Sequence, residues 1–288
     1  MRFGIHVGIS GGLIKAAEFA LESGCDCLQI FSSNPTGWRP GRLDEKQAEG
    51  FGRLARERSL FPVFLHTPYL INLATSKADF YEKSLILLRD ALFKAGRYTA
   101  LGVPGPSYVV THIGSHQGVG VEEGCGRVSE AIAALLADVP EGASFLIENN
   151  PGSGTELAHT FDEYALILAP LERYRSVLGV ALDTAHLWGA GYDISTAAGV
   201  NDTLAQFDRL VGLDRLKLVH ANDTVYGLGS HNDEHLHPGQ GKIGLECFRA
   251  LVRHPALEHV SFVQELPGLT AEENRGLISV LRDMAPGK

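Results

Sequence analysis

The chain has 288 residues, 44% of them hydrophobic and 20% charged, which is the composition of an ordinary globular protein. It contains no run of about 18 apolar residues, and this excludes a transmembrane helix and a membrane partner. The net charge of −9 argues against a nucleic-acid partner when it is taken alone. Bound divalent ions would offset part of that charge, so the net charge does not decide the substrate.

Two features favour a cytoplasmic location. The N-terminal residues Met1 to His6 run directly into a strand-like pattern, without the charged start, apolar stretch and cleavage site of a signal peptide. The four cysteines are too few for a disulfide framework, and Cys25 and Cys27 are separated by one residue rather than the two of a common zinc knuckle. We therefore expect a cytoplasmic protein with free thiols.

Short apolar runs recur along the chain and predict eight strands. Most are nearly continuous stretches of Val, Ile, Leu and Phe, as expected for strands that are buried on both faces. The predicted strands are Arg2–Val7, Cys27–Phe31, Val63–His66, Tyr108–Ile113, Ser144–Glu148, Leu178–Asp183, Leu216–His220 and Val260–Glu265.

Helical patterns lie between and after these runs. They cover Gly12–Ser23, Asp44–Arg58, Lys77–Leu101, Glu122–Ala137, Phe161–Leu171, Ala197–Val211, Leu245–Val252 and Ala271–Met284. Asp44 and Ser76 are plausible helix caps, as is Thr270 with Glu273 three residues later. The alternation predicts an α/β fold, a (β/α)8 TIM barrel, formed by residues 1–288 as a single domain. A doubly wound open sheet is the alternative, but it would not gather residues from six strands into one site.

Histidines and carboxylates stand at or just beyond the ends of six predicted strands and in the loop after the seventh. They are His66, His112, Glu148, Asp183, His186, His220, Asp233, His235 and Glu265. Any one of them could be a structural histidine or a helix cap. Together they are hard to explain without metal, because burying them would leave charges uncompensated. Nine ligands exceed what one zinc ion binds, so two or three ions about 4 Å apart are expected, an arrangement that suits phosphodiester hydrolysis.

Several motifs resemble one known family. They are His66–Leu73 (HTPYLINL), Asp183–His186 (DTAH) followed by Gly189–Asp193 (GAGYD), His220–Asp223 (HAND), and Asp233–His235 (DEH) followed by Gly239–Gly244 (GQGKIG). This set is similar to the endonuclease IV family of apurinic/apyrimidinic endonucleases, which has a xylose isomerase-like TIM barrel. The similarity runs from His6 to Glu265, nearly the whole chain.

The resemblance implies a trinuclear zinc enzyme of base-excision DNA repair that cleaves the backbone 5′ to an abasic site and leaves a 3′-hydroxyl. Carried over by position, it implies a first ion at His66, His112 and Glu148, a second at Glu148, Asp183, His220 and Glu265, and a third at His186, Asp233 and His235. Glu148 would bridge the first two ions, and Glu265 would also orient or help activate the attacking hydroxide. Manganese is an alternative to zinc at one or more sites, because both metals suit such ligands.

The family also inserts side chains into DNA beside the lesion. The resemblance implies DNA contacts by Tyr69, Leu70, Asn34, Trp38, Arg39 and Lys242, of which Tyr69 and Leu70 match the inserted positions. Tyr69 and Trp38 could instead be packing residues, and Lys242 could be a solvated lysine.

Four positions depart from the family's usual pattern. Thr36 and Glu234 stand where arginines are usual, Leu266 where a threonine is common, and Ile113 where a proline is common. The metal ligands are intact, but the lost cations weaken the expectation of tight DNA binding. His6 ends the first predicted strand near the site and is expected to support the ligands rather than to be one.

Two other functions remain open. A metal-dependent sugar isomerase or epimerase on a related barrel is the first, although such enzymes generally lack a third site like His186, Asp233 and His235. A degenerate binding protein is the second, but it would be expected to have lost ligands. We expect double-stranded DNA with abasic sites as the partner, no obligate protein partner, and a monomer.

Overall fold

The computed structural model describes residues 1–266 and 268–286. Eight parallel strands follow one another around a closed barrel, and β8 pairs with β1 to complete it. The strands are β1 (Arg2–His6), β2 (Cys27–Phe31), β3 (Val63–His66), β4 (Ser107–Thr111), β5 (Ala143–Glu148), β6 (Leu178–Asp183), β7 (Leu216–His220) and β8 (Ser261–Gln264). The predicted TIM barrel is therefore confirmed.

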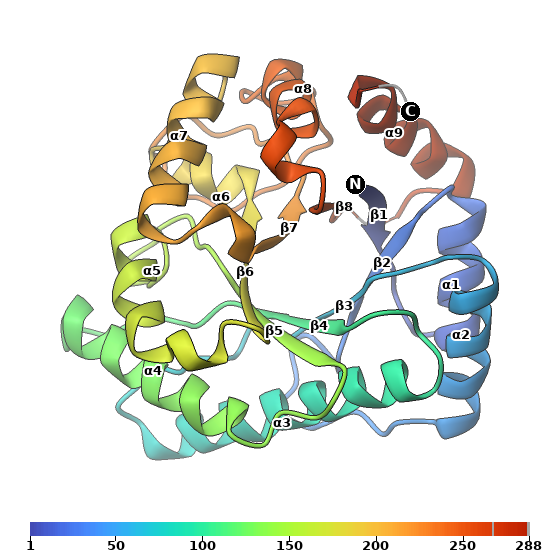
Figure 1. Cartoon of the computed structure of the whole chain (residues 1–288). Helices are drawn as coiled ribbons and strands as arrows, with labels where there is room; N and C mark the ends of the chain where they lie inside the picture. Colours follow the sequence, from blue (N-terminus) through green and yellow to red (C-terminus); the bar gives the residue numbers. More distant parts are fainter. Residues whose placement is uncertain (267, 287–288) are drawn as a thin grey trace.

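Helices form a ring around the barrel, with α3 along one side and α9 beside α1 (Figure 1). The α-helices are α1 (Leu13–Glu22), α2 (Glu45–Glu57), α3 (Ala78–Ala100), α4 (Val121–Leu136), α5 (Phe161–Leu168), α6 (Thr184–Gly189), α7 (Ala197–Leu210), α8 (Leu245–Arg253) and α9 (Ala271–Met284). Short 3-10 helices are η1 (Ala169–Tyr174), η2 (Leu213–Arg215) and η3 (Pro255–Leu257). Within the described ranges, every helix is too short or too polar to span a bilayer.

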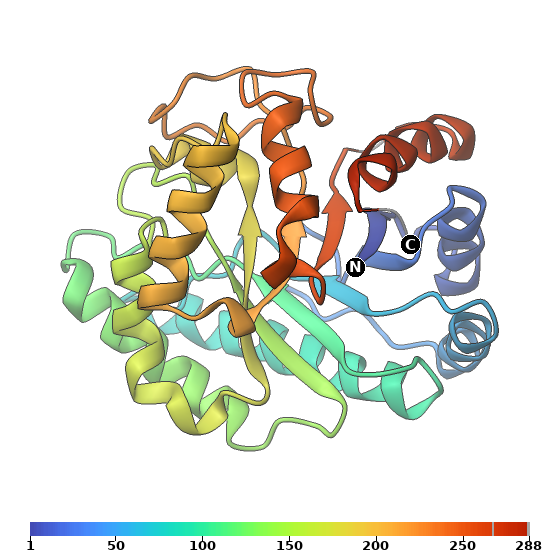
Figure 2. The same cartoon turned by 45° about the horizontal axis from the view of Figure 1, so that its top comes forward.

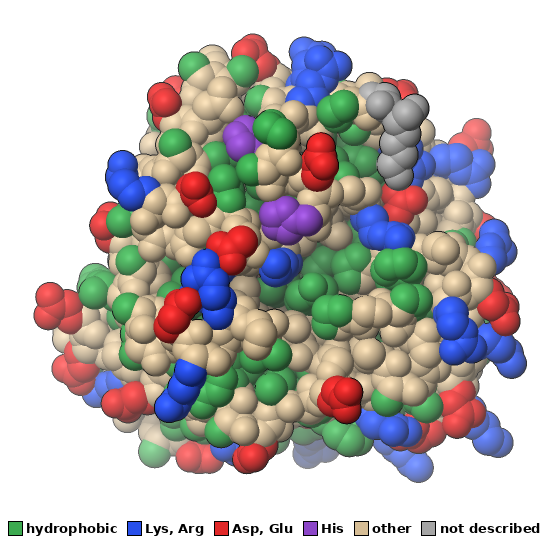
Figure 3. Space-filling view, in the orientation of Figure 1, with side chains coloured by type: hydrophobic (Ala, Val, Ile, Leu, Met, Phe, Trp, Pro, Cys, Tyr) green, Lys and Arg blue, Asp and Glu red, His purple; other side chains and the backbone are tan. Residues whose placement is uncertain are grey.

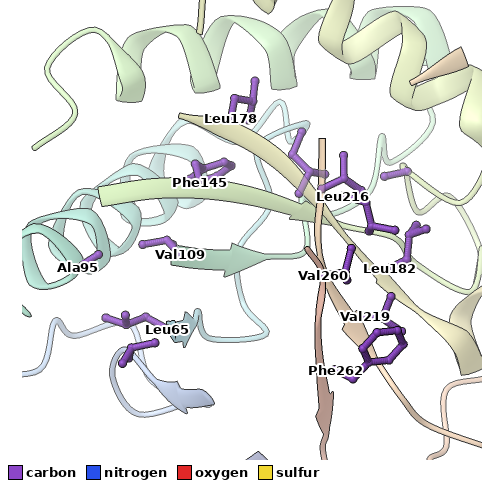
Figure 4. Close-up of a cluster of buried hydrophobic side chains, with 14 of the residues drawn as sticks. Leu65, Ala95, Val109, Phe145, Leu178, Leu182, Leu216, Val219, Val260 and Phe262 are labelled. Carbon is purple, nitrogen blue, oxygen red and sulfur yellow. The ribbon is translucent and has the colours of Figure 1, made fainter. Parts of the chain in front are cut away.

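Alternate residues of each strand face two separate apolar layers, because successive side chains on a strand point to opposite faces. The layer between strands and helices includes Leu65, Val109, Phe145, Val219 and Phe262, several of which are drawn in Figure 4. The layer inside the barrel consists of the neighbouring strand residues Cys27, Phe64, Val110, Leu146, Ala181, Leu218 and Val263. The barrel interior is therefore filled by apolar side chains, which lie just below the C-terminal ends of the strands.

The element boundaries agree with the predictions except in a few places. The predicted Ser76 cap is wrong, because α3 begins after Lys77, and the Lys77 amide donates to the hydroxyl of Thr75 instead. The Asp44 cap and the Thr270–Glu273 capping box are both present. β4 ends at Thr111, one residue before His112, and the short helix α6 was not predicted.

Long connections at one end of the barrel carry the residues discussed below. In Figure 2, the connection from β7 to α8, residues 221–244, rises beyond the ends of the strands. On the face shown in Figure 3, acidic and basic side chains are interspersed rather than gathered by sign. The described residues of that face therefore form no extended basic surface of the kind that dominates non-specific DNA binding.

Candidate metal centre

The strand periodicity explains why the predicted ligands converge. His66 lies two residues after Phe64, Glu148 two after Leu146, and Asp183 two after Ala181, and all three earlier residues face the barrel interior. His112, His220 and Glu265 stand in the same relation to Val110, Leu218 and Val263. Because side chains two residues apart on a strand point the same way, all six side chains point into the C-terminal mouth of the barrel.

Three groups of ligand atoms form at this mouth, each with its atoms within 4.8 Å of one another. The groups are His66 with His112 and Glu148, then Glu148 with Asp183, His220 and Glu265, and finally Asp183 with His186 and His235. Asp233 lies outside these groups, but its Oδ1 is 3.1 Å from His186 Nε2 and 3.0 Å from His235 Nε2. The structure therefore brings all nine predicted ligands together.

Glu148 joins two of these groups through different oxygens. Its Oε2 lies 3.0 Å from His66 Nε2 and 3.6 Å from His112 Nε2. Its Oε1 lies 2.7 Å from His220 Nδ1. A fully buried carboxylate that presents one oxygen to each of two ligand groups has the geometry of a bridge between two ions.

Asp183 also uses its two oxygens for different purposes. Oδ1 accepts from the backbone amides of Ala185 and His186, at 2.6 and 3.1 Å, and so caps α6. Oδ2 accepts from Asn222 Nδ2 at 2.6 Å and lies 3.5 Å from His235 Nε2. The cap fixes the rotamer of Asp183, and α6 in turn places His186 one helical turn beyond the strand.

Backbone carbonyls hold two of the histidines in one orientation. His66 Nδ1 donates to the carbonyl of Thr67 at 2.8 Å, and His186 Nδ1 donates to the carbonyl of Asn149 at 2.9 Å. A donated Nδ1 proton leaves the lone pair on Nε2 in a neutral imidazole. In both histidines this Nε2 is the atom that faces the carboxylates.

The electrostatics of the mouth favour positive charge among the carboxylates. Burial alone would lower the pKa of His220, but Glu148 and Glu265 outweigh it and raise this pKa to about 9. Burial would raise the pKa of Glu148, yet His220 and His112 lower it well below its ordinary range. Burial lowers the pKa of His112 to about 4, so this side chain is neutral at pH 7, as a metal ligand must be.

The donor set fits a metal. The buried nitrogens His112 Nδ1, His186 Nε2 and His235 Nε2 make no hydrogen bond within the described part of the chain. Buried polar atoms are seldom left without partners unless a water or an ion is to satisfy them. Imidazole nitrogens beside carboxylate oxygens are the ligand types of zinc and manganese.

A cavity of about 720 Å³ opens over the centre. His66, His112, His186 and His235 line it, and Tyr69, 64% exposed, stands at its rim. The Tyr69 ring packs edge-on against Phe31, with the centroids 5.7 Å apart. The candidate ligands thus form part of the cavity wall.

The other predicted DNA-binding residues lie on loops at the same end of the barrel. Asn34 and Arg39 are exposed, and Trp38 is half-buried in edge-on contact with Phe80 at 5.6 Å. Asn34 Oδ1 accepts from both the amide and the hydroxyl of Thr36, which gives this side chain a structural role in the turn. Leu70 is half-buried after Tyr69, and Lys242 is exposed.

A buried lysine supports the loop that carries these residues. Lys94 of α3 is 3% exposed, and its Nζ donates to the Ser32 carbonyl at 2.8 Å and to Asp90 Oδ2 at 2.6 Å. The loop after β2 is therefore fixed to α3 by a paired, desolvated charge.

The four departures fall in different surroundings. Thr36 is exposed on the loop after β2, and Glu234 lines the cavity. Ile113 is fully buried behind His112, and Leu266 lines the cavity next to Glu265. Glu234 thus places an acidic side chain at the cavity, Thr36 is an uncharged surface residue, and Ile113 is a packing residue.

Three buried amides support the centre, and none was predicted as a site residue, although Asn222 lies within the quoted HAND motif. Gln29 contacts His220 and Glu265, and Asn222 Nδ2 donates to Asp183 Oδ2 and to Glu265 Oε2. Asn149 exchanges hydrogen bonds with the backbone of Asp183. The strand period could have indicated Gln29, which lies two residues after the interior residue Cys27.

Fold and site together define a (β/α)8 barrel enzyme with a candidate multinuclear metal centre at the C-terminal ends of its strands. A model of the family described as Xylose isomerase-like TIM barrel matches residues 17–283. The chain is 45% identical over 267 residues to a probable endonuclease 4 from Natranaerobius thermophilus, covering 93% of this chain and 92% of the relative.

Solved structures agree. The endonuclease IV of Thermus thermophilus superposes with a TM-score of 0.84 at 35% identity, covering 99% of this chain and 98% of that one. The chain belongs to the endonuclease IV family. A D-psicose 3-epimerase from Clostridium cellulolyticum matches with a TM-score of 0.65 at 16% identity, over 99% of this chain and 96% of that one, and shares the fold.

Proposed function

We propose that the chain is a zinc-dependent DNA-repair endonuclease that hydrolyses the phosphodiester bond 5′ to an abasic site and leaves a 3′-hydroxyl. The supporting observation is the bridging geometry of Glu148, whose two oxygens face two groups of ligand atoms at the mouth of the barrel. The relatives named above as endonuclease 4 and endonuclease IV supply the reaction class.

Three ions would be held at this mouth, with zinc expected and manganese as the alternative. The ligands would be His66, His112 and Glu148 for the first, Glu148, Asp183, His220 and Glu265 for the second, and His186, Asp233 and His235 for the third. When bound, such ions supply a nucleophilic water of lowered pKa and positive charge beside the scissile phosphate.

The chain's own side chains would orient the reactants. Glu148 is fully buried and stays ionised, because the histidines around it lower its pKa. Glu265 accepts from Gln29 at 2.5 Å and from Asn222 at 3.1 Å, so its carboxylate is held in one orientation at the cavity. From there it would accept a hydrogen bond from the attacking water and align it with the phosphorus.

DNA recognition would come from the exposed loops around the cavity. Tyr69 and Leu70 would insert beside the lesion, and an extruded abasic sugar would enter the cavity. Asn34, Trp38, Arg39 and Lys242 would contact the backbone, which positions a protein on DNA without reading sequence. We further propose that residues 1–288 act as one barrel domain, as a monomer, and in the cytoplasm.

The first test is cleavage of a duplex oligonucleotide with one abasic site by the zinc-loaded chain, beside the same duplex without the lesion. We expect nicking of the lesion duplex alone, its loss on chelation, and its return when zinc is added. His220→Ala should abolish nicking. His259→Ala is a suitable control, because His259 binds the Leu216 carbonyl at 3.0 Å, outside the candidate centre. Full activity of His220→Ala would contradict the site assignment.

The comparisons do not favour the alternative expected from the sequence, a sugar isomerase or epimerase, because the epimerase match shares only the barrel fold. A chain that binds divalent metal but fails to nick abasic DNA, and that interconverts sugars or sugar phosphates, would establish this alternative. The charge changes at Thr36 and Glu234 would then be the reason for the altered substrate.

A further inference from the structure

Gln29 occupies a ligand-like position without being a metal ligand. It lies on β2, two residues after the interior residue Cys27, and is fully buried. Its amide Nε2 donates to Glu265 Oε1 at 2.5 Å and lies 3.0 Å from His6 Nδ1, and its Oε1 lies 2.8 Å from His220 Nε2. Both donor hydrogens of this amide are therefore used, and so is its acceptor oxygen.

The orientation of the amide is fixed by Glu265. An ionised carboxylate can only accept hydrogen bonds, so the amide nitrogen must face Glu265, and the carbonyl oxygen must face His220. The opposite orientation would place two acceptor oxygens 2.5 Å apart. Glu265 thus determines that the amide nitrogen of Gln29 faces His6 and that its carbonyl oxygen faces His220.

Gln29 has opposite effects on the two histidines: it accepts a hydrogen bond from His220 and donates one to His6. The Gln29 carbonyl can only accept, so His220 carries a proton on Nε2. In the metal-free structure Nδ1 donates to Glu148 Oε1 at 2.7 Å, and a bound metal would take the place of that Nδ1 proton, since Nε2 stays engaged by Gln29. The Gln29 amide can only donate, so His6 uses its Nδ1 lone pair to accept, and a neutral His6 carries its proton on Nε2. His6 lies outside the ligand groups found in the described residues, and its Nδ1 lone pair is already engaged by the Gln29 amide.

We propose that Gln29 is a positioning residue of the metal centre. It sets Nδ1 as the metal-binding atom of His220, orients Glu265, and keeps His6 from acting as a ligand. An amide achieves this without adding charge beside Glu148, Asp183 and Glu265, whereas a carboxylate at position 29 would repel Glu265. The inference rests on the proposed function only in that a metal is bound here, and it requires no DNA.

The test compares Gln29→Met with Gln264→Met. Both substitutions remove an amide and keep an unbranched side chain of similar length. Gln264 is a matched control, because it is also a strand residue and 3% exposed, but its amide contacts His237 and the Leu277 carbonyl. Zinc affinity is measured by competition with a chromophoric chelator, after denaturant unfolding of the metal-free variants has verified that they fold.

We expect Gln29→Met to bind its weakest zinc ion about 10- to 100-fold less tightly than the wild-type chain, as is usual for lost support of a ligand. Gln264→Met should stay within about threefold of it. Equal weakening by both substitutions, or wild-type affinity in Gln29→Met, would overturn the proposal. A wild-type chain that binds no metal would overturn the proposed function as well, so the two failures are distinguishable.

A second readout reports the tautomer directly. Nitrogen NMR of the imidazoles in the zinc-loaded wild-type chain should show a proton on Nε2 of His220. Gln29→Glu keeps an acceptor for that proton and should retain the signal, whereas Gln29→Met should lose the hydrogen-bonded shift. An unchanged His220 signal in Gln29→Met would refute the positioning role even if zinc affinity fell.

Discussion

In the metal-free chain, raising the pH should destabilise the fold. Without metal, protons on the buried histidines supply the positive charge that offsets the carboxylates of the centre, and these protons are lost as the pH rises. Burial lowers the pKa of His220, but Glu148 and Glu265 outweigh it, and the pKa rises from 6.5 to about 9. A raised folded-state pKa contributes stability that is complete below pH 6.5 and is lost as the pH rises through 9. At about 1.4 kcal/mol per pKa unit, His220 alone accounts for about 3 kcal/mol.

The other histidines of the centre do not cancel this effect. The carboxylates around His235 overcome its burial and raise its pKa to about 9, so it acts in the same direction. The pKa of His112 is lowered by burial to about 4, and the pKa of His6 is also lowered by burial. Groups with a lowered pKa change their protonation below pH 6.5. Between pH 6.5 and 9, the change in folding stability therefore comes from the histidines whose pKa is raised.

The assay is urea unfolding, followed by tryptophan fluorescence at pH 6, 7, 8 and 9 with chelator present. The free energy of unfolding should fall by about 3 kcal/mol or more across this range, and His220→Gln should reduce the slope. The zinc-loaded chain should behave in the opposite way, because ligand imidazoles must lose their protons to bind metal. A metal-free stability that is flat or rises between pH 6.5 and 9 would refute the reasoning.

Three further substitutions test separate parts of the account. Tyr69→Ala should weaken binding to abasic duplex on the order of tenfold with unchanged zinc content, because Tyr69 is exposed and aromatic contacts with bases are worth a few kcal/mol at most; loss of zinc would instead make it structural. Asp90→Ala should cost about 3 kcal/mol in urea unfolding, since it leaves the buried Lys94 ammonium unpaired; a change near zero would mean that water solvates this charge. Gly241→Ala should cost about 1 to 3 kcal/mol, because a Cβ there would lie 2.3 Å from the Thr224 carbonyl oxygen; wild-type stability would show that the loop shifts freely.

The sequence alone predicts the strands and the ligand set because both depend on short-range regularities. Each buried strand appears as a short apolar run, and the barrel then brings the residues two positions after the last interior ones into a common mouth. His66, Asp183 and His220 close their strands in the structure as the pattern predicted. The predicted fourth strand, Tyr108–Ile113, ends two residues early in the structure because strand pairing stops at Thr111.

The remaining features depend on contacts that no local pattern specifies. Nothing local in the sequence assigns a role to Gln29, or to Asn222 within the HAND motif, and only the closed barrel places both amides against Glu265. Lys94 cannot be distinguished by type from a surface lysine, although it is paired and buried beneath the loop after β2. The cap at Ser76 was mispredicted because the hydroxyl of Thr75, one residue earlier, accepts the hydrogen bond from the Lys77 amide.

The central claim is that these nine side chains form a metal centre that cuts DNA beside an abasic site. The most direct measurement is product mapping on a duplex labelled separately at each end, with a single abasic site and zinc-loaded protein. The account predicts one nick immediately 5′ to the lesion, with a 3′-hydroxyl that a polymerase extends, and no nick after chelation. A cut on the 3′ side, a blocked 3′ end, or an equal cut in undamaged duplex would contradict it.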